Sequence, residues 1–194
     1  MYNNLKKLGL ILASGYLLSG CAAVVVGGVA AGATSGAAVA TDPRSSSGVF
    51  DDQGLKNKVK DSLDAMIPGN SIEVTSYNQN ILLTGQVIDT ENKGKAVTVT
   101  KQVVGVKKIY DYIEVGATQS ASQTSKDAYL TSVVKSNLLV SKGVDSNNVK
   151  VVTTNSIVYL MGLVDKEQAK KIEAAALEVD GVKKVVSLFQ YVNN

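Results

Sequence analysis

The chain contains one pattern of apolar residues and glycines twice, and this internal repeat constrains its fold more than any other feature. In each copy, a leucine or valine at every fourth residue forms a triplet, and the second triplet follows the first by 75 residues. The triplets are Leu55, Val59 and Leu63, and Leu130, Val134 and Leu138. This spacing predicts a helix with one buried face at the start of each copy.

Two alternating apolar segments follow each of these helices and meet at an asparagine, Asn78 or Asn155. The arrangement predicts two antiparallel strands joined by a tight turn. Gly85 and Gly162 lie near the end of the second strand of each pair. We expect the missing side chain there to allow a helix or a backbone segment to approach closely.

A second helix and a third strand complete each copy. Asp89 and Asp165 are favourable N-cap residues, and Gly105 and Gly181 end the helices that follow. The β-branched alternation after each glycine predicts a strand. The predicted fold class is therefore α+β, with two tandem αββαβ domains, each a three-stranded mixed sheet packed against two helices.

The N-terminus has the features of a bacterial lipoprotein signal peptide. Lys6 and Lys7 precede an apolar stretch, Leu8 to Leu18, that is shorter than a membrane span. The sequence LSGC ending at Cys21 resembles the lipobox, in which the cysteine thiol is joined to diacylglycerol. We expect a signal peptide at residues 1–20 and lipidation of Cys21, the alternative being an unmodified cysteine beside an uncleaved anchor.

Residues 22–40 are rich in alanine and glycine and are nearly long enough to span a bilayer. Because such residues gain little from burial in lipid, a flexible tether is favoured over a helical or membrane-associated segment. The predicted organisation is a lipidated N-terminus and tether at 21–48, a first domain at 49–117, a linker at 118–125 and a second domain at 126–194.

The residue content excludes several kinds of functional site. With no His and one Cys, the chain cannot form a Cys/His zinc site, a Ser-His-Asp triad or an intrachain disulfide. We predict no catalytic or metal-binding residues, no cofactor and no enzymatic activity. Lys6 and Lys7 supply two of the three net positive charges, so the mature chain is nearly neutral and no nucleic-acid partner is expected.

The combination of these elements resembles the BON domain. The residues that carry the resemblance are the paired hairpins ending in L-x-G-x-V, the helix after each, and the closing G-V-x-x-V strand. Together with Cys21 and the TDPRS segment at Thr41, they make the chain similar to outer-membrane lipoproteins with two BON domains. The resemblance implies a non-catalytic periplasmic protein that supports envelope integrity, in a family proposed to bind phospholipid. Ala22 after the cysteine implies the inner leaflet of the outer membrane.

The first helix of the second copy carries large apolar residues outside its core triplet, at positions where the first copy has none. At about 100° per residue they cluster on or beside a separate face of the helix. These residues are Tyr129, Val133, Leu139 and Val140, and they align with Gly54, Lys58, Asp64 and Ala65 of the first copy. Lys135 and Lys142 lie nearby in sequence.

We predict that these four apolar residues and two lysines bind anionic phospholipid, because a shallow apolar face flanked by lysines is typical of helices that dock on membranes. One alternative is that the face packs against the first copy, since tandem domains need an interface. An alternative function is that of a protein–protein adaptor for the outer-membrane assembly machinery.

Overall fold

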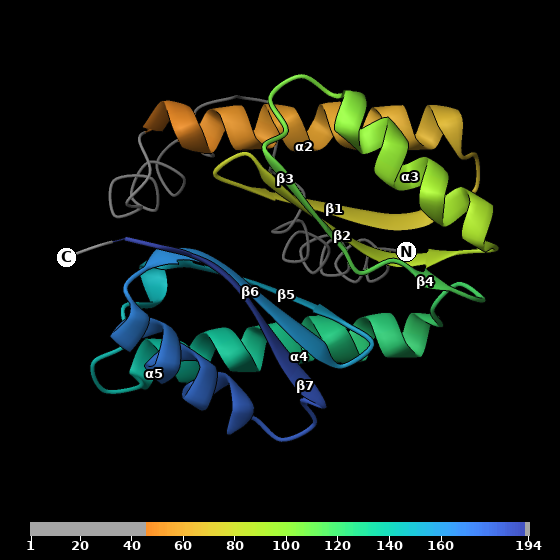
Figure 1. Ribbon diagram of the computed structural model, residues 1–194. Coiled ribbons are helices and arrows are strands. Elements are labelled where there is room, and N and C mark those ends of the chain that lie inside the picture. The colour runs from red at the N-terminus through yellow and green to blue at the C-terminus, as the bar shows by residue number, and fades with distance from the viewer. Residues whose placement is uncertain (1–45, 193–194) are drawn as a thin grey trace, which may run out of the picture. The chain divides into compact units, whose positions relative to one another are not determined.

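The computed structural model describes residues 46–192, and every structural statement below refers to that part of the chain. The predicted signal peptide, Cys21 and most of the predicted tether lie outside it. Two α+β domains follow one another along the described residues (Figure 1). None of the helices within residues 46–192 is both long enough and apolar enough to cross a bilayer.

The first domain packs two helices against one mixed sheet. Its elements are α2 (Ser46–Met66), β1 (Ser71–Tyr77), β2 (Asn80–Val87), α3 (Thr90–Gln102), β3 (Lys108–Asp111) and β4 (Glu114–Val115). Strand β2 pairs antiparallel with β1 and parallel with both β3 and β4.

The third strand of the first domain is divided into β3 and β4, where the sequence predicts one strand. The Asp111 carboxylate accepts a hydrogen bond from the Ile113 amide at 3.0 Å, and Lys93 Nζ donates to the Ile113 carbonyl at 2.6 Å. The Ile113 side chain is buried in the core. At the break between β3 and β4, the amide and the carbonyl of Ile113 therefore hydrogen-bond to the side chains of Asp111 and Lys93.

The second domain repeats this order with an undivided third strand. Its elements are α4 (Ala121–Val140), a 3-10 turn η1 (Ser146–Asn148), β5 (Val149–Thr154), β6 (Ile157–Val164), α5 (Lys166–Leu177) and β7 (Lys184–Tyr191). Strand β6 pairs antiparallel with β5 and parallel with β7. The predicted α+β fold with two tandem αββαβ domains is confirmed.

The first helix of each domain begins earlier than the sequence analysis expected. Helix α2 starts at Ser46, within the segment assigned to the tether, and α4 starts at Ala121, within the segment assigned to the linker. Ser120 caps α4, because its hydroxyl accepts a hydrogen bond from the Gln123 amide at 3.2 Å.

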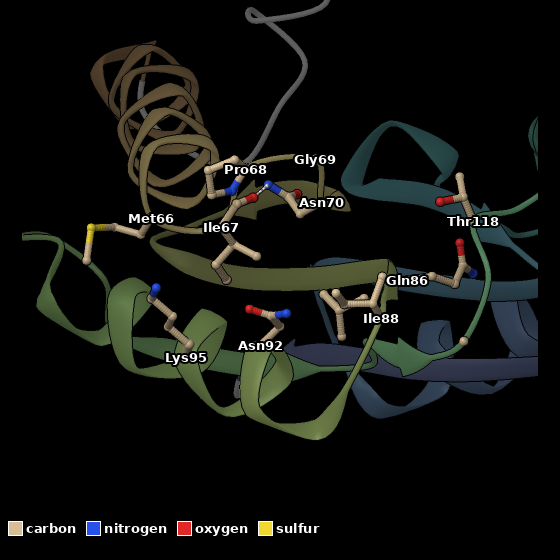
Figure 2. Close-up of a pocket in the computed structure, with 12 residues that line it drawn as sticks. Met66, Ile67, Pro68, Gly69, Asn70, Gln86, Ile88, Asn92, Lys95 and Thr118 are labelled. Atoms are coloured by element: carbon tan, nitrogen blue, oxygen red, sulfur yellow. Dashed lines mark hydrogen bonds between the residues drawn. The ribbon is translucent and has the colours of Figure 1, made fainter.

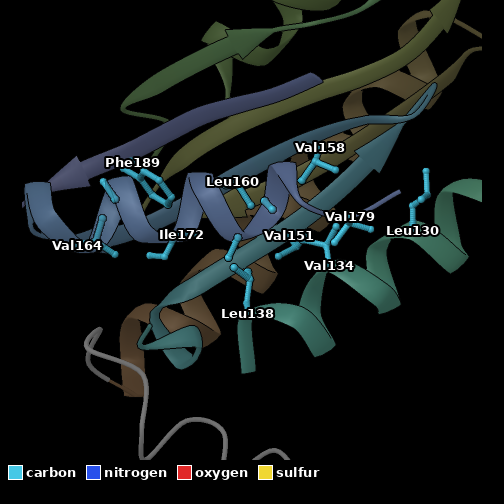
Figure 3. Packing of buried hydrophobic residues seen from close by; sticks show 13 residues of the cluster. Leu130, Val134, Leu138, Val151, Val158, Leu160, Val164, Ile172, Val179 and Phe189 are labelled. Carbon is cyan, nitrogen blue, oxygen red and sulfur yellow. The ribbon is translucent and has the colours of Figure 1, made fainter. Parts of the chain in front are cut away.

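Each domain has its own hydrophobic core on the helical side of its sheet. In the second domain the triplet on α4 faces residues of β6 and α5, among them Leu160 and Ile172 (Figure 3). The triplet on α2 is buried in the same way in the first domain. All six triplet residues are at most 6% exposed, which confirms the helical faces predicted from their spacing.

Both predicted glycines lie against backbone, as expected. A Cβ on Gly162 would lie 2.5 Å from the Asn148 carbonyl oxygen. A Cβ on Gly85 would overlap the Ser71 carbonyl oxygen, and the φ of +98° at Gly85 is one that other residues rarely adopt. Gly85 is therefore the more constrained of the two glycines.

A buried aspartate from the first helix holds the hairpin turn of each domain. The two residues at each turn have left-handed φ angles between 50° and 65°. They are Asn78 and Gln79, and Asn155 and Ser156. The Asp127 carboxylate accepts both turn amides of its domain at 2.8 Å, and Asp52 accepts those of the first domain at 2.6 and 2.8 Å. The carboxylates thus bind backbone donors that the turn itself leaves free.

A third cluster of buried residues joins the two domains through their sheets. Its buried members are Tyr77, Leu82, Tyr159, Met161 and Leu188. At its edges, Asn78 Nδ2 donates to Gln190 Oε1 at 2.7 Å, and Asn155 Nδ2 donates to Glu114 Oε2 at 2.5 Å. The two turn asparagines thus make equivalent contacts, each with the last strand of the other domain.

Tyr159 is one of the buried residues of this interface. Its ring packs on that of Tyr112, with the ring centroids 4.8 Å apart. Burial, followed by the charge of Glu114 and by Tyr112, raises the pKa of Tyr159 to about 12. The hydroxyl therefore stays protonated throughout the neutral range.

Candidate lipid-binding surface

Helix α4 presents three large apolar side chains that nothing in the described residues covers. Tyr129, Leu139 and Val140 are 66%, 71% and 78% exposed, and so are Lys135 on the same helix and Lys142 two residues after it. These five residues are called the α4 surface below. They do not pack against the first domain, because the interdomain contact uses the sheets instead. The alternative role of this face as the interdomain interface is therefore not what the structure shows.

Val133 does not share this exposure. It is half-buried and packs against the core of the second domain. On the same side of α4, Asn137 Nδ2 donates to the Ala175 carbonyl of α5 at 2.7 Å. Val133 is therefore partly covered by the domain core, and a substitution there would disturb packing as well as any surface role.

The first domain supplies an internal comparison for the α4 surface. On α2, Lys60 forms an ion pair with Asp64 one turn later. The hydrogen bond from Lys60, with one from Asn70, lowers the pKa of the Asp64 carboxyl. The aligned residues of α4 are Lys135 and Leu139, so the second domain has an exposed leucine in place of the carboxylate.

Neither lysine of the α4 surface forms an ion pair in the described part of the chain. Lys135 and Lys142 are therefore exposed cations without an ion-pair partner among these residues.

A pocket of about 180 Å³ lies in the first domain, between the end of α2, β2 and the start of α3 (Figure 2). Its lining includes Ile88, Asn70 and Lys95, and none of the predicted lipid-binding residues. The Asn70 side chain has a structural role at the end of α2, because its Nδ2 donates a hydrogen bond to the Ile67 carbonyl at 2.8 Å. Within the described residues no group of His, Cys, Asp or Glu is arranged to hold a metal ion.

Comparison with known proteins assigns the family. The sequence profile of the BON domain matches residues 51–117 and 126–193, which are the two αββαβ domains described above. The chain belongs to the BON domain family and is a non-catalytic protein.

Three relatives share much of the chain. It is 38% identical over 192 residues to the outer membrane lipoprotein DolP of Haemophilus influenzae, covering 97% of both chains. It is 34% identical to a 21 kDa hemolysin of Actinobacillus pleuropneumoniae, covering 78% of this chain and 79% of the relative. It is 35% identical to the osmotically-inducible protein Y of Escherichia coli, covering 70% of both.

Proposed function

We propose that this chain is an outer-membrane lipoprotein that faces the periplasm, binds anionic phospholipid through the α4 surface of its second domain and supports the integrity of the cell envelope. The observation that carries this proposal is the exposure of Tyr129, Leu139 and Val140 beside lysines that have no carboxylate partner among the described residues. The aligned α2 has a Lys–Asp ion pair instead.

The residue types of the α4 surface suit the membrane interface. Tyrosine has an apolar ring and a polar hydroxyl, so it gains from lying between acyl chains and water. Each lysine near an anionic surface contributes about 1 kcal/mol, an effect that salt screens. The apolar side chains supply the rest of the binding free energy, because they are buried in the outer layer of the lipid.

Anchoring to the membrane is assigned to Cys21. The similarity to a lipoprotein over 97% of the chain supports cleavage after residue 20, a tether at 21–48 and the inner-leaflet position that Ala22 implies. Mass spectrometry of the mature N-terminus is expected to find an acylated Cys21. A mature chain that begins at Met1, or one with an unmodified cysteine, would contradict this part of the proposal.

Co-sedimentation with vesicles tests the lipid-binding function. Both domain cores lie within residues 46–192, so a soluble chain from Thr41 onward retains the folded part. This chain is expected to bind phosphatidylcholine vesicles that contain phosphatidylglycerol, to bind pure phosphatidylcholine weakly, and to dissociate as salt rises.

The substitution Tyr129→Asp should abolish that binding, whereas Gly54→Asp at the aligned position of α2 should leave it unchanged. Neither position is buried, so both variants should melt like the parent. Equal binding of the parent chain to both kinds of vesicle, or none to either, would reject the function in favour of the adaptor alternative.

A further inference from the structure

We propose that Lys171 of α5 acts together with Lys142, two residues after the end of α4, and binds the phosphate of an anionic phospholipid headgroup. This inference rests on the proposed function and extends it, because it adds a second helix to the lipid contact. The site residues predicted from the sequence all lie on α4 or directly after it, and Lys171 is not among them.

The first observation is the position of the Lys171 amine. A Cβ placed on Gly143, the residue after Lys142, would lie 3.6 Å from Lys171 Nζ. Lys171 thus reaches across from α5 to the segment that follows α4. Lys171 of α5 therefore lies next to Gly143, the residue that follows Lys142 in the chain, at what we call the corner of the second domain.

The corner is held by hydrogen bonds that do not involve the lysines. Gln168 Nε2 donates to the Gly143 carbonyl at 2.9 Å, and Gln168 Oε1 accepts from the Asp145 amide at 3.1 Å. One side chain of α5 therefore fixes the loop after α4 in place. The positions from which Lys142 and Lys171 extend are set before any ligand arrives.

The corner holds the two lysines together with the carboxylate of Asp145 in the loop and that of Glu167 on the first turn of α5. No ion pair to Lys142 or Lys171 is present in the described part of the chain. The carboxylate of Asp145, also in this loop, accepts hydrogen bonds from the Asn147 amide and from Asn148 Nδ2. A phosphate at this corner would supply a negative charge to Lys171 and to Lys142, and the exposed Leu139 and Val140 at the end of α4 would meet the acyl chains.

The first domain lacks this pair of cations. Lys95 aligns with Lys171, but it lines the pocket of Figure 2. Lys142 precedes the left-handed Gly143, and the residue that precedes the matching left-handed Gly69 of the first domain is Pro68, which carries no charge. The two-lysine corner is therefore specific to the domain that carries the exposed apolar residues of α4.

Quantitative binding of the chain from Thr41 to vesicles of phosphatidylglycerol and phosphatidylcholine tests the inference. At low salt, Lys171→Gln should weaken binding about fivefold. Two matched variants remove the same charge elsewhere: Lys170→Gln, turned about 100° away on α5, and Lys95→Gln on α3. Each of these should change the affinity by less than about twofold. All three lysines are exposed, so melting should be unaffected.

The outcomes separate this inference from the proposed function. A larger loss for Lys171→Gln than for both controls supports the corner as a headgroup site. If Lys171→Gln lowers the affinity no more than the controls do, while Tyr129→Asp still abolishes binding, the role of Lys171 is rejected. Lipid binding through the α4 surface is then still supported. If Tyr129→Asp binds vesicles like the parent, the proposed function fails and this inference fails with it.

Discussion

Replacing Gly85 with valine is expected to lower the free energy of unfolding by about 3 to 5 kcal/mol, combining backbone strain with overlap. At a φ of +98° a β-branched side chain is strained, and its Cβ would overlap the Ser71 carbonyl of the paired strand. Neither strand can move away freely, because every residue of β1 is paired with β2. Chemical denaturation followed by circular dichroism measures the loss.

Valine substitutions at two other glycines, with smaller expected losses of stability, serve as comparisons. Gly162→Val should cost less than Gly85→Val, because Gly162 approaches the Asn148 carbonyl without a left-handed φ. Gly94→Val on the exposed side of α3 meets nothing within 4 Å and should change stability by less than about 1 kcal/mol. Equal stability of all three variants would show that the close backbone contact at Gly85 is not rigid.

Asp127→Ala should destabilise the second domain by about 3 kcal/mol, because it leaves two backbone donors without their charged acceptor. The carboxylate is buried and accepts the Asn155 and Ser156 amides, both at 2.8 Å. The left-handed turn between β5 and β6 depends on that bond pair. Denaturation midpoints and hydrogen exchange of the two amides both report the loss.

The neighbour Lys126 provides the control, since it is exposed on the same turn of α4. Lys126→Ala should stay within about 0.5 kcal/mol of the parent. If the Asn155 and Ser156 amides of Asp127→Ala exchange as slowly as those of the parent, the turn keeps its conformation without the carboxylate and the prediction is wrong. Asp52→Ala should reproduce the effect in the first domain, where Asp52 makes the same two contacts.

The fold was predictable because its main features are periodic in sequence. Triplets at four-residue spacing indicate the buried helical faces, and alternating strands around an asparagine indicate the hairpins. The turn aspartates were missed although a signal exists. Asp52 and Asp127 each stand three residues before the first leucine of their triplet, so both copies place a carboxylate near the buried face of the helix.

The interdomain contact was missed for a different reason. The hairpins were interpreted as alternating strands with one buried face, yet all eight residues of β2 are buried, and β6 is nearly so. Runs such as ILL and IVYLM are typical of strands covered on both faces. The apolar face of α4 was considered for this contact instead, since exposure cannot be inferred from one helix without its neighbours.

The candidate site was predictable only in part. Comparing the two copies located the exposed residues Tyr129, Leu139 and Val140, because a duplicated helix shows which apolar positions the core does not need. It did not separate Val133, which packs partly against the core of the second domain. Lys171 lies far along the chain from Lys142, and only tertiary packing brings its amine to Gly143.

The most direct test of the account uses the absence of tryptophan from the chain. In Tyr129→Trp, a single indole reports on the α4 surface, and in Gly54→Trp it reports on the aligned position of α2. With phosphatidylglycerol vesicles carrying brominated acyl chains, the emission of the Tyr129→Trp variant should shift to shorter wavelength and be quenched, while that of the Gly54→Trp variant should not change. Quenching in neither variant when the protein is bound to vesicles, or equal quenching in both, would contradict docking through the second domain.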